Sequence, residues 1–482
     1  MKKRQWFVFV VLTSLLGTLG FFGYQRLGGS LPDTGAESVA EPDEEEDGAL
    51  VRVAEPQESG AENEDGQGAP VNSAEADDAE EEHATIRVVG LGAESIAPGI
   101  IAGGGLVSTD ASDFARASLD VRLRKVSEVS AAERALSLGG DDDDGAHLLI
   151  LPLPSFVASY ERLRALDPRI VGVAGWSQGR DALYGPASDS LMQNRRTRRA
   201  ATVALCAELG TPESFFALYL LELSGTSVSD VNLQERCGSG FRAHDRSAGT
   251  DAGSGRLIAT SADASTLVPW VIIAPATVYD DEGGQELLGR WLHGWFEGVE
   301  EIREHAADSA RLIATATNSD PVRILQHLGQ IQVADLAQNV RAFGLSGRGA
   351  LSMNTLFGET WRIWREAGVL VTPAPSQTPV DSSLVALAAR ASAVVPTPPA
   401  ARTSFDTAPI LRVPITNAAE LVHRVGWLAD LFPRSAIEVR APGNARQREE
   451  LHDEIVARFG LASARLRITQ HRPRQVIVYG VE

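Results

Sequence analysis

The run RIVGVAGWSQGRDALYG, residues 169–185, joins a long apolar stretch to a polar turn between glycines. Such a run is typical of a strand that is buried on both faces. The pentapeptide GWSQG at 175–179 also has the G-x-S-x-G spacing with which α/β-hydrolases hold a nucleophilic serine on a strand-to-helix turn. Ser177 is therefore either a nucleophile or a small polar residue at the end of a buried strand.

Two features of the sequence argue against the hydrolase. The nucleophile turn begins a full helix, whereas Gly185-Pro186 would stop a helix after Gly179 within about two turns. The triad also needs a later acid and then a histidine, and His327 is the best candidate for that histidine, without local support. We predict that the protein is not an enzyme and has no catalytic residue, and keep a serine hydrolase using Ser177 as the alternative.

Strands and helices of about a dozen residues alternate around this run, which indicates a parallel sheet covered on both faces. After a weak break at 185–200, a second group of strands and helices begins. We therefore predict an α/β module of two lobes at 85–371, with the second lobe at about 200–280. The aromatic stripe of the long helix predicted after 282, which includes Trp291 and Trp295, is expected in the core.

The N-terminus carries an apolar run without charges at 6–24. A membrane-spanning helix needs roughly 20 such residues, and no small-x-small cleavage site follows. We expect an uncleaved signal anchor at 1–28, with the inner membrane as partner and the bulk of the chain in the periplasm. Cleavage of this segment as a signal peptide is the alternative.

Most of the net charge of −20 lies in one segment, since nineteen acidic residues face only Arg52 between Leu31 and His83. Such a composition cannot bury enough apolar surface to fold, so 29–84 is predicted to be a disordered acidic tether. The rest of the chain is only mildly acidic, which excludes a strong nucleic-acid surface.

Cys206 and Cys237 are the only cysteines. They form either a disulfide in an oxidising compartment or two buried thiols. Neither has a Cys or His neighbour at zinc spacing, so we predict no metal site and no cofactor.

Small polar residues stand where ligands bind in open α/β sheets, at the ends of strands and the starts of helices. The candidates are Ser95, Ser155, Ser177 and Thr211. Two lobes that present such residues would form a cleft for a small ligand, with an anion as one option because helix N-termini favour negative charge. The alternative for each residue is a simple helix cap.

The order IRVVGLG, LDVRLRKV, AHLLILPLPSFVASY and VGVAGWSQGRDAL resembles the periplasmic substrate-binding proteins of the nitrate, sulfonate and taurine ABC importers, including the thiamine-pyrimidine-synthesis-like group. The resemblance covers about 86–370 and implies a type II two-lobed fold, a small-molecule ligand and an ABC permease as partner. It also implies the ligand-binding residues Ser95, Ser155, Trp176, Ser177 and Thr211. The family usually has an aromatic residue in its first-helix region, and GLGAESIAPG has none, which leaves the ligand class open.

A Pro-containing linker is predicted at 372–407 and a small α+β domain at 408–482. ITNAAEL, AIEVRA and the helix that ends in ARFGL resemble the OmpA-like peptidoglycan-associated fold. The family's Thr-Asp motif is replaced by RAPGN, which puts wall binding in doubt, although Arg448 falls near the family's helix arginine. A degenerate domain that is retained for protein contacts is the alternative.

These features together predict a membrane-anchored, extracytoplasmic solute-binding protein that serves an ABC-type importer or envelope sensing. A non-transport envelope scaffold with a vestigial cleft is the other alternative. The sequence specifies neither the ligand nor the oligomeric state.

Overall fold

The computed structural model describes residues 83–186, 191, 203–234, 240–249, 255–281, 283–347, 349–392 and 404–480. The chain divides into a unit at Met1–Asp77 and a unit at Asp78–Glu482. The expected signal anchor and nearly all of the expected tether lie outside the described residues. Within those residues, no helix combines the length and the apolar character that a bilayer crossing needs.

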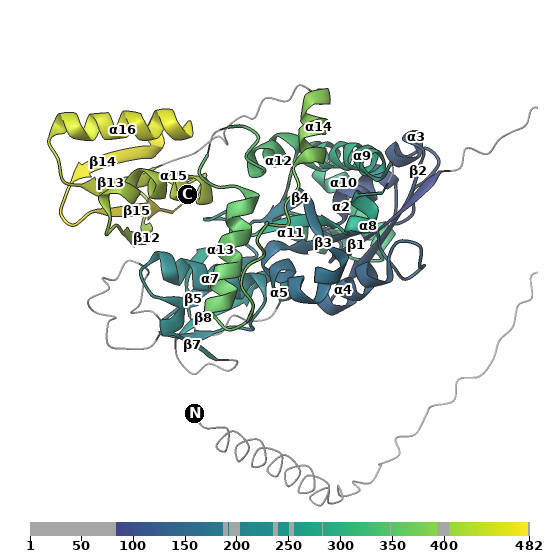
Figure 1. Ribbon diagram of the computed structural model, residues 1–482, viewed down its shortest axis with the longest axis horizontal. Coiled ribbons are helices and arrows are strands. Elements are labelled where there is room, and N and C mark those ends of the chain that lie inside the picture. Colours follow the sequence, from purple (N-terminus) through teal and green to yellow (C-terminus); the bar gives the residue numbers. More distant parts are fainter. Residues whose placement is uncertain are drawn as a thin grey trace, which may run out of the picture. The chain divides into compact units, whose positions relative to one another are not determined.

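The first lobe contains a six-stranded sheet in the order β11-β4-β10-β3-β1-β2 (Figure 1). β1 runs parallel to β2 and β3, whereas β10 is antiparallel to β3 and β4, and β11 is antiparallel to β4. The sheet is therefore mixed and not parallel as expected, because β10 enters it on the way back from the second lobe. Its strands are β1 (Ala84–Leu91), β2 (Leu119–Val126), β3 (Leu148–Pro152), β4 (Arg169–Ser177), β10 (Pro269–Ala274) and β11 (Ile331–Val333).

The second lobe contains a five-stranded sheet in the order β7-β6-β8-β5-β9. β6 is parallel to β7 and β8, and β5 is antiparallel to β8 and β9. This sheet begins about twenty residues before the expected boundary near 200, and β10, which the sequence placed in this lobe, belongs to the first sheet. Its strands are β5 (Asp181–Gly185), β6 (Val203–Cys206), β7 (Val231–Gln234), β8 (Phe241–Asp245) and β9 (Arg256–Thr260).

The chain crosses between the sheets twice, at 178–180 and at 261–268. Ser261 joins the two crossings, because its Oγ accepts hydrogen bonds from the backbone N–H of Gly179 at 2.9 Å and of Asp181 at 3.1 Å. Gly179 has a φ of +81°, a conformation that glycine adopts without strain. The GWSQG run is therefore the end of β4 and the start of the turn that leads into β5.

Helices cover the first sheet and connect it to the second lobe. Trp291 and Trp295 of α9 are buried, as expected from the aromatic stripe. α13 packs against both α5 of the first lobe and α7 of the second. The helices are α2 (Ala97–Gly103), α3 (Asp113–Arg116), α4 (Val129–Leu138), α5 (Leu153–Leu163), α7 (Pro212–Leu223), α8 (Ala276–Tyr279), α9 (Gly284–Glu304), α10 (Ala306–Thr317), α11 (Pro321–Leu328), α12 (Leu336–Ala342), α13 (Met353–Glu366) and α14 (Ser383–Ser392).

The C-terminal region has a four-stranded sheet in the order β12-β15-β13-β14 and two helices, which agrees with the predicted α+β pattern. It is docked on the two-lobed module: Trp427 Nε1 donates to the Tyr219 hydroxyl at 2.7 Å, and Thr266 Oγ1 donates to the Asp430 carbonyl at 2.6 Å. Its elements are β12 (Pro409–Pro414), α15 (Leu421–Leu431), β13 (Ile437–Ala441), α16 (Ala445–Phe459), β14 (Leu466–Gln470) and β15 (Gln475–Tyr479).

Candidate functional site

A cavity of about 1150 Å³ lies between the two sheets of the module. The first lobe contributes the turn after β1, the end of β2 and the start of α5, and the second contributes β5, the start of α7 and the end of β8. All three first-lobe segments follow or contain the carboxyl end of a strand, where open α/β sheets bind ligands. We call this cavity the interlobe cleft.

A chain of charged side chains crosses the interlobe cleft. Arg180 Nη1 donates to Glu94 Oε1 at 2.7 Å, and Arg180 Nη2 donates to Asp245 Oδ2 at 3.1 Å. Glu94 belongs to the first lobe, while Asp245 ends β8 of the second. The guanidinium of Arg180 also lies 5.3 Å from the ring centre of the buried Trp270 on β10. Arg180 is therefore held by two carboxylates and an aromatic face.

The turn after β1 places the Glu94 carboxylate. Gly92 has a φ of +84°, and a Cβ on it would lie 2.6 Å from Glu94 Oε1, so only glycine leaves room for that carboxylate. Ser95 Oγ donates to the Gly92 carbonyl at 2.9 Å and closes the turn. Burial alone would raise the pKa of Glu94, but the neighbouring His327 and the charge of Arg180 lower it to about 2. Glu94 is thus ionised at neutral pH.

Asp181, at the start of β5, is the most deeply buried carboxyl of the interlobe cleft, with 1% of its surface exposed. Its Oδ2 has no hydrogen-bond partner among the described residues. Burial raises the pKa of Asp181 to about 6, although a hydrogen bond from Ser177 and the charge of Arg180 act in the opposite direction. An oxygen that is both buried and unpaired indicates a missing partner.

Glu213, in the first turn of α7, adds a second carboxyl to this part of the interlobe cleft. Burial and the negative charge of Asp181 raise its pKa to about 7, with a further contribution from Asp245, while hydrogen bonds from the backbone and Thr211 lower it. Two neighbouring carboxyls whose pKa values are both raised repel each other when ionised. They favour a positively charged partner.

The structure distributes the sequence-predicted residues over different places. Ser155 and Thr211 line the interlobe cleft, and Thr211 caps α7 as expected, accepting from Ser214 N. Ser95 is buried in the turn after β1 and does not cap α2, whose N-cap is Ile96. Trp176 lines a separate cavity of about 490 Å³ beside the C-terminal region, together with Arg341 and Asp430.

Ser177 lies outside the lining of the interlobe cleft and is buried beneath it. Its Oγ is 2.8 Å from Ser261 Oγ, which also accepts a hydrogen bond from the backbone N–H of Asp181 at 3.1 Å. In the described ranges no histidine nitrogen is among its partners, since His327 instead faces Glu94, with 3.8 Å between Nδ1 and Oε2. The turn leads into strand β5 and not into a helix. The geometry of a hydrolase nucleophile is therefore not present at Ser177.

Arg448 on α16 donates to the Gly443 carbonyl at 2.7 Å, so it braces the loop that precedes its own helix. Cys206 is disulfide-bonded, and Cys237 lies outside the described residues. Within the part of the chain that the structure describes, no group of three or more His, Cys, Asp and Glu side chains could hold a metal ion.

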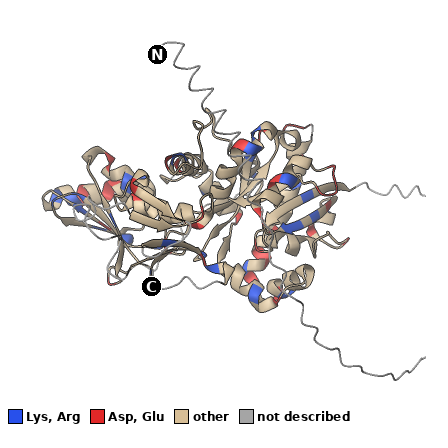
Figure 2. Ribbon diagram, turned by 90° about the horizontal axis from the view of Figure 1, so that it is seen from below, with Lys and Arg blue, Asp and Glu red and all other residues tan. Residues whose placement is uncertain are grey.

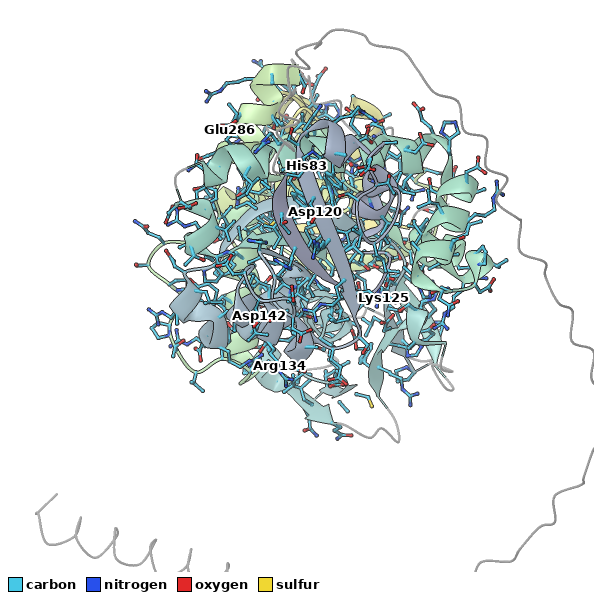
Figure 3. The ribbon with its side chains drawn as sticks, turned by 90° about the vertical axis from the view of Figure 1, so that its right-hand side faces the viewer. His83, Asp120, Lys125, Arg134, Asp142 and Glu286 are labelled. Atoms are coloured by element: carbon cyan, nitrogen blue, oxygen red, sulfur yellow. The ribbon has the colours of Figure 1, made fainter. Side chains whose placement is uncertain are left out.

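The basic residues at the mouth of the interlobe cleft are paired with groups of the protein or exposed. Lys125, labelled in Figure 3, lies at the end of β2. Its Nζ donates to the Thr317 carbonyl at 3.0 Å. Arg162 binds Glu133 through two of its nitrogens, and Arg323 is exposed. Figure 2 shows Lys and Arg interspersed with Asp and Glu along the described ribbon. The lining has six carboxyl residues, Glu94, Asp181, Glu208, Glu213, Asp245 and Asp320, against four basic ones, Lys125, Arg162, Arg180 and Arg323.

The charged residues of the interlobe cleft are neighbours of the predicted ones. Glu94 precedes Ser95, Arg180 and Asp181 follow GWSQG, and Glu213 follows Thr211 by two positions. A search for small polar residues at helix caps does not identify these charged residues. A charged residue next to an otherwise buried strand end is the signal that could have identified them.

No protein-family model and no curated protein matches the chain. Among solved structures, the chain is similar to the periplasmic nitrate-binding protein of Synechocystis PCC 6803, at 11% identity and a TM-score of 0.46 over 64% of this chain and 89% of that one. A ligand-binding component of an ABC-type import system from Staphylococcus aureus, with zinc bound, matches at 11% identity and a TM-score of 0.43 over 64% and 99%. The periplasmic aliphatic sulphonate-binding protein of Escherichia coli matches at 12% identity and a TM-score of 0.41 over 61% and 93%.

A desulfurization enzyme also matches, at 11% identity and a TM-score of 0.39 over 64% of this chain and 99% of that one. At such identities and TM-scores, none of these similarities assigns a ligand or an activity to this chain. The function has to be inferred from the interlobe cleft itself.

Proposed function

We propose that the protein is a solute-binding protein that captures a small molecule in the interlobe cleft. The observation that carries the proposal is the meeting of buried charged groups from both lobes around one cavity of about 1150 Å³, large enough for a small organic molecule. A pair such as Glu94 and Arg180 is costly to bury. Its position at the cavity is explained if the pair shapes a binding site.

Binding should be detectable as thermal stabilisation of the full chain, in a panel of small oxyanions, sulfonates and amines. A ligand at a hundred times its Kd stabilises the native state by about 2.7 kcal/mol. Ala158→Trp puts a large ring into the interlobe cleft from α5 and should abolish the shift. Ser130→Trp, on the exposed side of α4, should leave it intact. A panel without any stabilising compound, or equal shifts in wild type and Ala158→Trp, would contradict the proposal.

The same proposal includes the cellular location of the protein and its partners. The apolar run at 6–24 supports an inner-membrane anchor, which would hold the interlobe cleft in the periplasm at the end of the acidic segment. An ABC permease or an envelope sensor would receive the ligand. The docking of the C-terminal region on the module, through Trp427 and Asp430, supports the alternative of a domain retained for protein contacts. Peptidoglycan binding near Arg448 stays a prediction.

A further inference from the structure

Two carboxyls of the interlobe cleft lack an available opposite charge. Asp181 has a buried Oδ2 without a hydrogen-bond partner in the described residues. Asp181 and Asp245, both negative, raise the pKa of Glu213. Asp181 is buried and Glu213 is half-buried, and an uncompensated carboxylate away from water is costly, so a protein keeps such a pair only where something neutralises it.

Arg180 cannot neutralise the pair, because Glu94 and Asp245 already share its guanidinium, with N–O distances of 2.7 and 3.1 Å. For the same reason Arg180 is unavailable to an anionic ligand. His327 faces Glu94, and Lys125 and Arg162 are bound at the mouth. Of the four basic residues that line the interlobe cleft, only the exposed Arg323 is left without a partner among the described residues, so the part around Asp181 and Glu213 offers acceptors and no unshared cation.

We propose that the ligand is an organic cation whose ammonium or amidinium group binds between the carboxylates of Asp181 and Glu213. This assignment rests on the proposed solute-binding function and differs from the anion that the sequence analysis gave as one option. A cationic N–H donor would satisfy the orphaned Asp181 Oδ2 with a charge-assisted hydrogen bond.

The remaining lining favours an organic molecule over a bare ion. The described residues provide no metal site, and the volume far exceeds that of an ion. The cleft wall includes the Trp270 ring and the apolar side chains of Leu91, Val129, Leu209 and Ile324. Such a wall packs against the hydrocarbon part of an amine.

Binding of a cation should depend on pH through these two carboxyls. The groups that act on Asp181 are Ser177, Arg180, Asp245 and Glu213. Glu213 faces Thr211 besides the two aspartates, and Glu94 and His327 lie beyond Arg180. Since the pKa values of the pair are raised to about 6 and 7, both carboxyls become protonated as the pH falls from 8 to 5. Affinity for the cation should decrease over that range.

The test measures the affinity of the full chain at pH 8 for putrescine, agmatine and tetramethylammonium, and for nitrate, sulfate and methanesulfonate. At least one cation should bind, and Asp181→Asn and Glu213→Gln should each weaken it by about ten- to a hundredfold, as expected for loss of a charge-assisted hydrogen bond. Asp110→Asn, an exposed residue away from the cleft, should change the affinity less than about twofold.

The outcomes separate this assignment from the proposed function. Cation binding that is lost in Asp181→Asn and weakens at pH 5 supports both. Anion binding that Ala158→Trp abolishes, without cation binding, would leave the solute-binding function standing and overturn the cation. Failure of all three cations to bind at pH 8, or unchanged cation affinity in both carboxyl variants, would also overturn it.

Discussion

Asp181→Asn should make the ligand-free protein more stable at pH 8, by up to about 3 kcal/mol. The folded-state pKa of Asp181 is about 6 and the ordinary value is 3.8, and each pKa unit corresponds to about 1.4 kcal/mol. Because the folded pKa is raised, this carboxyl's contribution to stability is complete below about pH 4 and is lost as the pH rises through 6. Asparagine has nearly the same shape and does not ionise.

Denaturant unfolding of wild type and Asp181→Asn between pH 4 and pH 8 measures this effect. The advantage of the variant should grow as the pH rises, whereas Asp110→Asn should follow the wild type. A stability difference that is independent of pH would show that the Asp181 charge is not destabilising. A gain in stability together with a loss of cation binding would identify Asp181 as a residue kept for function at a cost in stability.

Asp430→Ala should lower the free energy of unfolding by about 3 kcal/mol. The carboxylate of Asp430 is buried at 7% exposure and accepts from Arg341 Nη2 at 2.9 Å, from Ala350 N at 2.5 Å and from Leu351 N at 3.0 Å. Removing one partner of a buried charged network costs about 3–5 kcal/mol, and the partial exposure of Arg341 favours the lower end. This carboxylate connects the C-terminal region to the segment between α12 and α13.

The shift in the denaturation midpoint of the full chain measures the effect. Asp430→Asn retains one acceptor oxygen and should cost less, and Arg341→Ala combined with Asp430→Ala should cost less than the sum of the two single variants. Additive effects, or a loss below about 1 kcal/mol for Asp430→Ala, would mean that the contact does not hold the C-terminal region in place.

The sequence predicted individual helices and strands better than it predicted which strands pair in a sheet. The alternation of apolar runs and capped helices identified both lobes, and Thr211 caps α7 as expected. β5 was not identified, because five residues carry little local pattern and its neighbours β8 and β9 follow far along the chain. β10 was placed in the wrong lobe for the same reason: nothing local tells to which sheet a returning strand belongs.

Two of the predicted site residues, Ser155 and Thr211, line the interlobe cleft, and Ser95 lies one position away from the lining residue Glu94. Successive side chains on a strand point to opposite faces of the sheet. At the end of β4, Trp176 therefore lines the separate cavity of about 490 Å³, whereas Ser177 contacts Ser261. Ser95 closes the turn that places Glu94, and Ser177 contacts Ser261, which accepts from the backbone N–H of Asp181. The small polar residues therefore identified the turns that lie near the interlobe cleft. Which charged side chains face the cleft depends on the backbone direction at these turns and on ion pairs between the lobes, and neither can be predicted from the local sequence.

We propose that a ligand bridges the two lobes inside the interlobe cleft. Hydrogen–deuterium exchange of the full chain, with and without the best-binding compound, tests this most directly. Bound ligand should slow exchange in peptides of both lobes, those that cover the turn at 91–96 and those that cover 180–183 and 211–215. Protection of only one lobe, or protection confined to peptides around Trp176 and Arg341 at the separate cavity, would contradict the claim.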